Sequence, residues 1–487
     1  MPHSPASPGG SAAADLVNAR IDRLPRWGLS RVAFVILGLA YFIDIYDITI
    51  IGYTLTAMTK HFGLSTAEVT VMLTGNAITT ALGAFLFGSL GDILGRRRTY
   101  LLGMAALGTT ALLCAFAWSA ESLVVLRVVT GFATGGGLAV CTSYVQESSP
   151  AKRRGRYVSI TVLASSVGGL AAALLSGWLV PLNAEGWRWV YGVGALAFVL
   201  MLGARRSVLP ESARWLALKG RTGEANTIVA AMESRLRRSG HTLPEPVVEA
   251  SEAVPARFPV SALLRPPYLQ RLLVAAAFWF GVQWSVRATT TFQPTILGQY
   301  GMNLSTVATI TSVGQVAGIV GYLLTPLVVD RLERRTLIVT GLLIATASTV
   351  VITAGGGSIF AYLVAAVMLH GFASLIFVPG YNYAAEIFPT HARATGASLA
   401  GGLGQVGGIV QSLVLVPVVA GAGAATSQLL IGSGYAFAAL VVFLLAIPTT
   451  GRALSAISAA PGSRRKAGPT SAVPDREREQ PPVAGTP

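Results

Sequence analysis

Twelve apolar runs of about 20 residues or more dominate the sequence and restrict its fold. A run of this length, coiled as an α-helix, crosses roughly 30 Å of hydrocarbon. Only 12% of the residues are charged, whereas soluble domains average about 25%. We therefore predict an all-α membrane protein with spans at about 31–58, 69–91, 99–119, 121–147, 157–181, 187–204, 271–298, 304–329, 336–354, 358–386, 394–420 and 427–449.

The charges between these runs predict how the chain crosses the membrane. Basic residues cluster in alternate short loops, at Arg96–Arg98, Lys152–Arg156 and Arg331–Arg335, and the loops between them hold almost no charge. By the positive-inside rule, both termini and the segment 205–270 face the cytoplasm. The same rule accounts for the formal charge of +15. We therefore expect a lipid bilayer and no nucleic acid around the chain, in the plasma or inner membrane.

Two stretches of the sequence occur twice, about 239 residues apart. The pattern Tyr-x-x-Glu-x-x-Pro-x-x-x-Arg occupies 144–154 and again 383–393, and Gly88–Arg97 has a counterpart in Pro326–Arg335. Such repeats indicate a duplicated architecture. We predict the following organisation: an N-terminal tail (1–30), a six-helix bundle (31–204), a linker loop (205–270), a second six-helix bundle (271–450) and a disordered tail (451–487).

The repeated stretches place acids and arginines at the cytoplasmic ends of the predicted helices. An acid near a helix end, followed by a tight turn and arginines, can form a charged latch at the membrane surface. Gly95 permits such a turn at positive φ. The second copy has Pro326 and Glu333 where the first has glycines. The alternative is that the arginines only set the topology.

These stretches resemble the major facilitator superfamily, and the resemblance covers residues 31–450. Gly88–Arg97 is similar to the signature between its helices two and three, and Arg127 with Gly131 matches its Arg-x-x-x-Gly. Pro210–Leu216 resembles the Pro-Glu-Ser-Pro-Arg-Trp-Leu signature of the sugar-porter-like branch. The resemblance implies two six-helix bundles, a central cavity and alternating access by rocking of the halves. The residues that we expect to act in gating are Gly88, Asp92, Gly95, Arg96, Arg97, Glu147, Arg154, Glu211, Arg214, Asp330, Arg334, Glu386 and Arg393.

Two aspartates, Asp44 and Asp47, lie well inside the first span and share one helix face. Ionisable groups at this depth are costly and usually face a cavity or a partner. Two close carboxylates at low dielectric do not readily ionise together, which suits a proton carrier. Alternatively, one of them only bonds backbone or tyrosine groups. Arg127, near the outer end of span four, acts in proton coupling, as its motif match implies, or simply snorkels.

Arg287, in span seven, is the main candidate for binding substrate. It lies 16 residues after Arg271, as Asp47 lies 16 after Arg31, so the two charges should reach the cavity at one depth from opposite halves. An arginine there can clamp a carboxylate, or pair with an aspartate when the site is empty. A permanent Asp–Arg pair and snorkelling are the alternatives. Further candidates, which could equally form interhelical bonds, are Gln283, Trp284, Gln293, Gln315 and Gln411.

The Asp44-x-x-Asp47 pair looks like that of the aromatic-acid and metabolite proton symporters of this branch, with Ile45 in place of their usual glycine. Span five contains no proline, unlike the helix-five motif of the drug/proton antiporters. Span seven lacks a Gln-Gln pair like those that sugar porters use.

We predict a monomeric secondary transporter that couples protons to the symport of a small organic anion, such as a carboxylate. An exporter or a neutral metabolite or sugar carrier is the first alternative. A membrane sensor with a regulatory 205–270 loop is the second. The sequence offers no nucleophile–base or metal-ligand set and no phosphate-binding Gly-x-x-x-x-Gly-Lys loop, so we expect neither an enzyme nor a cofactor. Cys114 and Cys141 are interpreted as core residues.

Overall fold

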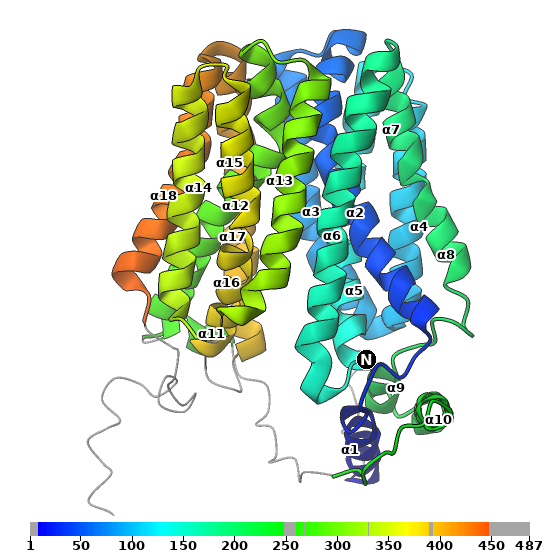
Figure 1. Ribbon diagram of the computed structural model, residues 1–487. Helices are drawn as coiled ribbons and strands as arrows, with labels where there is room; N and C mark the ends of the chain where they lie inside the picture. The colour runs from blue at the N-terminus through cyan, green and yellow to red at the C-terminus, as the bar shows by residue number, and fades with distance from the viewer. Residues whose placement is uncertain (1–7, 248–259, 267, 330, 389–392, 448–487) are drawn as a thin grey trace, which may run out of the picture.

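The computed structural model describes residues 8–247, 260–266, 268–329, 331–388 and 393–447. Its first half holds α2 (Arg31–Phe62), α3 (Thr66–Leu94), α4 (Arg96–Ala115), α5 (Ala120–Ser148), α6 (Arg154–Leu179) and a broken rod of α7 (Gly186–Gly194) and α8 (Leu196–Gly203). Its second half holds α12 (Tyr268–Gln299), α13 (Leu304–Leu324), α14 (Arg334–Gly355), a rod of α15 (Ile359–Gly371) and α16 (Ser374–Glu386), α17 (Arg393–Gly421) and α18 (Gly423–Leu445). The predicted all-α fold with twelve spans in two bundles is confirmed (Figure 1).

Helix α12 differs from the other eleven rods in composition. The length and the apolar composition of each of the other eleven are sufficient for it to cross a membrane. In α12, a run of polar residues around Arg287 lowers the hydropathy. A spanning helix that carries polar residues usually presents them to protein or to a cavity rather than to lipid.

The local signals at the helix ends explain where several spans begin. Ser65 accepts a hydrogen bond from the backbone N–H of Glu68, and the Glu68 carboxylate accepts one from Ser65 N–H. Ser30 and Asn303 cap α2 and α13 in the same way with one side-chain bond each. These caps satisfy N–H groups that have no partner within the helix.

The two halves meet around a pseudo-two-fold axis. Thr56 of α2 and Thr295 of α12 face each other at 3.4 Å between their hydroxyl oxygens, and they are 239 residues apart. The same offset separates the two copies of the repeated sequence pattern. Gly52 lies against the backbone carbonyls of Thr290 and Thr291, where a side chain would collide. Helix α2 therefore crosses its own counterpart at equivalent residues.

Packing between the halves is concentrated at one end of the molecule. We call the end that carries Arg96, Arg154 and Arg334 the arginine-rich face, and the other the opposite face. Towards the opposite face two apolar clusters join the halves. One contains Leu55 and Phe292, and the other contains Tyr53 and Leu297. Towards the arginine-rich face the described residues form two separate clusters, one in each half.

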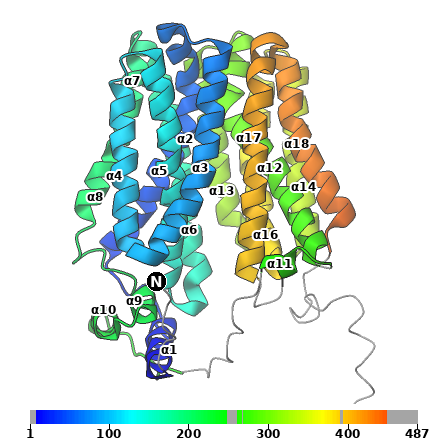
Figure 2. The same cartoon turned by 180° about the vertical axis from the view of Figure 1, so that it is seen from behind.

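Three helix pairs form the main border between the bundles in the described chain: α2 with α12, α6 with α13, and α3 with α17. Helices α6 and α13 pack together on the side seen in Figure 1, and α3 and α17 on the side seen in Figure 2. Every ion pair between described residues lies within one half and its attached segments. Neither the apolar clusters nor the ion pairs of the described chain bridge the halves at the arginine-rich face.

A small helical unit lies outside the bundles on the arginine-rich face. It comprises α1 (Pro8–Asp22), α9 (Ala213–Leu218) and α10 (Thr222–Arg238), which share one apolar core. We expected a tail at 1–30 and a loop at 205–270, so these three helices were not predicted. The signal was present, because Ala225, Val229, Met232 and Leu236 recur at helical spacing and are buried. The predicted tail at 451–487 lies outside the described residues.

Glu233 of α10 holds α1 in place. Its carboxylate accepts hydrogen bonds from Arg20 at 3.0 and 2.8 Å and from Arg23 at 2.7 Å. Burial by itself would raise the pKa of Glu233, but the bonds from Arg20 and Arg23 outweigh it and lower the pKa below its ordinary 4.5. The carboxylate therefore stabilises this docking above the ordinary pKa, and the contribution is lost as the pH falls through the lowered value.

We expect Glu233→Gln to increase hydrogen exchange in α1 about tenfold at pH 7, because a hydrogen bond to a charged group contributes about 1.5–3 kcal/mol. Hydrogen-exchange mass spectrometry of the purified full chain measures this. The difference from the parent should disappear at low pH, where the parent carboxylate is also protonated. Glu224→Gln, which removes an exposed carboxylate paired within α10, is the control. Unchanged exchange in the Glu233 variant at pH 7 would contradict the assignment.

Candidate functional site

The first half contains a buried ion pair between α2 and α5. Arg127 Nη1 lies 3.2 Å from Asp47 Oδ1, and Arg127 Nη2 lies 3.4 Å from Asp47 Oδ2. Both residues are 1% exposed. The Arg127 guanidinium also lies over the ring of Tyr191, 5.1 Å from its centroid. Arg127 thus points into the bundle, and the snorkelling alternative does not describe this conformation.

Asp44 lies one helical turn from Asp47 and is fully buried. Neither of its carboxylate oxygens has a hydrogen-bond partner in the described part of the chain. A Cβ on Gly137 of α5 would lie 2.6 Å from Asp44 Oδ2, so the glycine makes room for the carboxylate. The Tyr100 hydroxyl interacts electrostatically with Asp44 and is likewise buried without a partner among the described groups. An unpaired buried carboxylate is far less costly as the neutral acid.

Arg287 is the corresponding charge in the second half. It lies three to four residues before Thr290 and Thr291, which contact Gly52, while Asp47 lies five residues before Gly52. At 1.5 Å per residue the two backbones reach the same layer to within roughly 3 Å. Arg287 is half-buried, and its Cδ lies 2.7 Å from where a Cβ on Gly408 would sit. It has no ion-pair partner among the described residues, and Asp47 pairs with Arg127 instead.

Of the five other predicted substrate-site residues, Gln283 and Trp284 bond inside the second half. Gln283 donates a hydrogen bond to Gln405 at 2.8 Å, and the Trp284 indole N–H donates to the Leu430 carbonyl at 3.0 Å. Gln411 is buried, and its amide nitrogen has no partner among the described residues. The side-chain carbonyl oxygen of Gln293 is also buried without a hydrogen-bond partner among the described residues. Gln315 borders Gly169 of α6, so it lies where the halves meet.

The charged latch residues form equivalent ion pairs in both halves. Arg96 and Glu147 pair at 2.9 Å in the first, and Arg334 and Glu386 pair at 2.7 Å in the second. These residues correspond in the duplication, so the second latch forms despite the missing glycines. Asp92 adds a contact to Arg96 at 2.8 Å. Asp330 lies outside the described residues, as does the side chain of Arg393.

The Pro210–Leu216 segment locks onto the first latch. The Glu211 carboxylate accepts hydrogen bonds from Arg97 N–H at 2.9 Å and Ser212 N–H at 3.0 Å. Arg214 donates to the Glu147 carbonyl at 2.8 Å. Asp22 of α1 accepts from both Arg214, at 2.6 Å, and Arg154, at 3.2 Å. Asp22 was not predicted, because nothing in a polar N-terminal segment marks it as a partner of distant arginines.

Gly95 is required at the turn into α4, and Gly88 is not. Gly95 has φ of 101°, and a Cβ there would collide with Glu211. A Cβ on Gly88 would meet nothing within 4 Å. The predicted role of Gly95 in the turn therefore has a steric basis, whereas that of Gly88 has none in this conformation.

We expect Gly95→Ala to destabilise the protein by about 1–3 kcal/mol, the usual cost of a backbone conformation reserved for glycine, plus the displacement of Glu211. Thermal unfolding of the purified protein, followed by intrinsic fluorescence, measures this loss. Gly88→Ala is the matched control from the same motif and should unfold like the parent. Equal unfolding temperatures for both variants would contradict this account.

The comparisons agree with this architecture. A family model described as Major Facilitator Superfamily matches residues 37–412 and, in a second match, 289–476. The gallate transporter of Pseudomonas putida is 29% identical over 406 residues, which cover 81% of this chain and 86% of the relative. The niacin transporter NiaP of Acinetobacter baylyi (strain ATCC 33305 / BD413 / ADP1) is 28% identical over 401 residues, covering 82% and 90%. A solved D-xylose-proton symporter superposes with a TM-score of 0.69 at 16% identity, covering 86% of this chain and 99% of that one.

Two related helical bundles that bury charged groups within the membrane define a multi-pass transporter, not an enzyme. The chain belongs to the Major Facilitator Superfamily.

Proposed function

We propose that the protein is a proton-coupled symporter of a small organic anion, most specifically an aromatic carboxylate, with the arginine-rich face in the cytoplasm. The observation that carries this is the distribution of charge in one layer of the membrane. The first half holds a closed Asp47–Arg127 pair beside the unpaired Asp44, and the second half holds the cation Arg287 without an ion-pair partner among the described residues. The gallate and niacin transporters, both named for aromatic acids, support the substrate class.

The residues divide the chemistry between the halves. Arg287 can donate two parallel hydrogen bonds from its guanidinium to the two oxygens of a substrate carboxylate. Protonation of Asp47 would cancel its attraction for Arg127 and free both side chains to move. Asp44, which has no cationic partner in the described chain, is suited to hold a proton in its neutral form. A proton would bind in the first half, and Arg287 of the second half would neutralise the anion. Both events would then favour the same movement of the halves.

Flux in proteoliposomes tests this proposal. The purified protein is reconstituted, a pH gradient is imposed in either direction, and labelled benzoate-type acids, xylose and an uncharged aromatic amide are compared. Accumulation of the carboxylate driven by an inward proton gradient, abolished by a protonophore, is the expected result. Carboxylate efflux driven only by exchange for protons would identify an exporter. Transport of the neutral compounds without the acids would overturn the proposed substrate class.

A further inference from the structure

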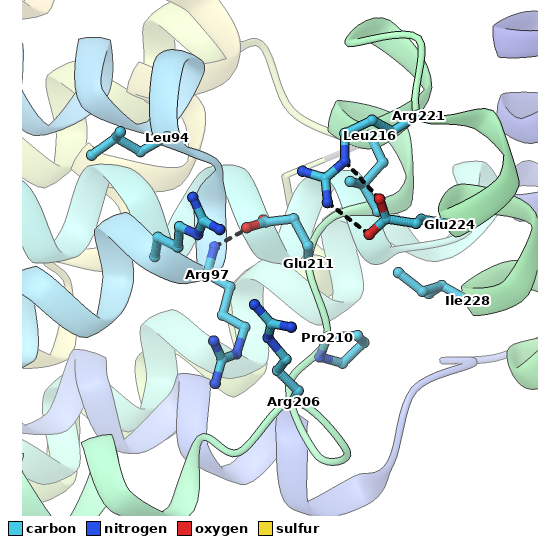
Figure 3. Close-up of a pocket in the computed structure, with 10 residues that line it drawn as sticks. Leu94, Arg97, Arg206, Pro210, Glu211, Leu216, Arg221, Glu224 and Ile228 are labelled. Atoms are coloured by element: carbon cyan, nitrogen blue, oxygen red, sulfur yellow. Dashed lines mark hydrogen bonds and ion pairs between the residues drawn. The ribbon is translucent and has the colours of Figure 1, made fainter.

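A cavity of about 160 Å³ lies between the first latch and the outer helical unit on the arginine-rich face (Figure 3). It is bordered by the ends of α3 and α4, the segment that follows α8, and helices α9 and α10. Four arginines and two glutamates supply its charges, so its lining carries a surplus of positive charge. The lining residues are Leu94, Arg97, Arg98, Arg206, Pro210, Glu211, Leu216, Arg221, Glu224 and Ile228.

The two glutamates do not neutralise the arginines that border the membrane. Glu211 is occupied by the backbone N–H groups of Arg97 and Ser212. Glu224 is held by Arg221 through two hydrogen bonds of 2.7 Å each. Arg98 and Arg206 make no ion pair with any described residue. Arg206 is also close enough to Arg97 for the two like charges to interact.

The side of this cavity with Arg98 and Arg206 is bordered by exposed apolar side chains of the first bundle. Arg98 stands in the first turn of α4, and Leu102, one turn further on the same face, is half exposed. Leu202, near the end of α8 and four residues before Arg206, is 68% exposed, and Ile93 is 65% exposed. Helices α4 and α8 lie at the outer edge of the first bundle (Figures 1 and 2). Unpaired arginines next to apolar side chains that face lipid match the junction between a phospholipid headgroup and its acyl chains.

We propose that this cavity binds the phosphate group of an anionic phospholipid from the leaflet on the arginine-rich face, with Arg98 and Arg206 as its main ligands. The phosphate would relieve the repulsion between Arg97 and Arg206, and the acyl chains would cover Ile93, Leu102 and Leu202. A soluble phosphate would satisfy the arginines but leave the apolar border unused. The bound phosphate is therefore assigned to a phospholipid and not to a soluble anion.

Lipid binding to the purified full chain tests this. Phosphatidylglycerol and phosphatidylcholine are titrated into detergent micelles, and bound lipid is counted by native mass spectrometry alongside the unfolding temperature. The test variant is Arg98→Gln with Arg206→Gln. Its matched control is Arg237→Gln with Arg238→Gln, which removes two exposed arginines from α10 outside the cavity.

We expect the parent and the control to retain phosphatidylglycerol at least tenfold more strongly than the test variant, with phosphatidylcholine showing no such difference. Equal unfolding temperatures of the test variant and the control without lipid would establish that the test variant is folded. If the test variant is not folded, the same lipid titration is repeated with the single variant Arg206→Gln. Equal phosphatidylglycerol binding by test variant and control would overturn the proposal. Equivalent stabilisation by inorganic phosphate alone would also overturn it, by assigning the cavity to a soluble anion.

Discussion

Replacing Arg287 by alanine is expected to reduce carboxylate uptake to background while leaving expression and folding intact. The side chain is half-buried, and it makes no ion pair with a described residue. Removing the Arg287 side chain therefore breaks no ion pair between described residues. The substrate anion, however, would lose its positive partner in a medium of low dielectric. Losing a hydrogen-bonded buried charge pair costs about 2–5 kcal/mol, which corresponds to a decrease of about thirtyfold or more in apparent affinity. Uptake of labelled carboxylate by cells, normalised to protein in the membrane, measures this.

Arg287→Lys separates charge from shape. A lysine retains the positive charge but not the two parallel N–H donors, so we expect partial uptake with a raised KM. The control is Arg331→Ala, which removes an exposed arginine from the arginine-rich face. If Arg287→Ala takes up substrate with unchanged affinity, the residue has no part in binding the anion.

Removing one partner of the Asp47–Arg127 pair is expected to abolish proton-driven accumulation. Asp47→Asn deletes a proton-binding group, and Arg127→Met leaves the Asp47 carboxylate buried without a counter-ion. An uncompensated charge of this kind destabilises a protein by about 3–5 kcal/mol. We therefore expect Arg127→Met and Asp47→Asn both to unfold at lower temperatures than the parent, because each leaves one buried group of the pair without its partner. Proteoliposome uptake with and without a pH gradient measures the coupling, and thermal unfolding measures the stability.

The double variant Asp47→Asn with Arg127→Met distinguishes a coupling role from a structural one. It removes both charges, so stability should return towards that of the parent, because the buried unpaired charge is gone. Proton-driven accumulation should stay absent, while exchange of substrate across the membrane at equal pH continues. Restored accumulation in the double variant would mean that the pair only supports the fold.

The sequence was sufficient for the fold because the constraints of a membrane act locally. Run length, the loop arginines and the two repeats specify the spans and their order without knowledge of contacts. The small outer unit was missed for the opposite reason. Helices α1 and α10 are short, polar on one side and stable only against each other, and the partnership of Arg20 and Glu233 joins residues 213 positions apart.

The site was predicted in its residues but not in its pairing. Counting from the helix ends placed Asp47 and Arg287 in one layer, and the duplication made them counterparts. It did not show that Arg127, assigned to the outer end of its span, reaches Asp47. Helix tilt and the conformation of the arginine side chain determine that contact, and the sequence specifies neither. Tyr191 and Gly137 were missed because only packing brings them to these charges.

The contact between Thr56 and Thr295 has an evolutionary consequence. In a symmetric homodimer, a residue on the two-fold axis touches its own copy in the partner, and these threonines occupy that position within one chain. A dimer of identical subunits must carry the same side chain at both equivalent sites. A fused gene is free of that rule, and here neighbouring positions have diverged to an acid, Asp47, and a base, Arg287. Joining two such subunits in one chain thus allows the two halves to carry different charged residues at matching depths, as Asp47 and Arg287 do.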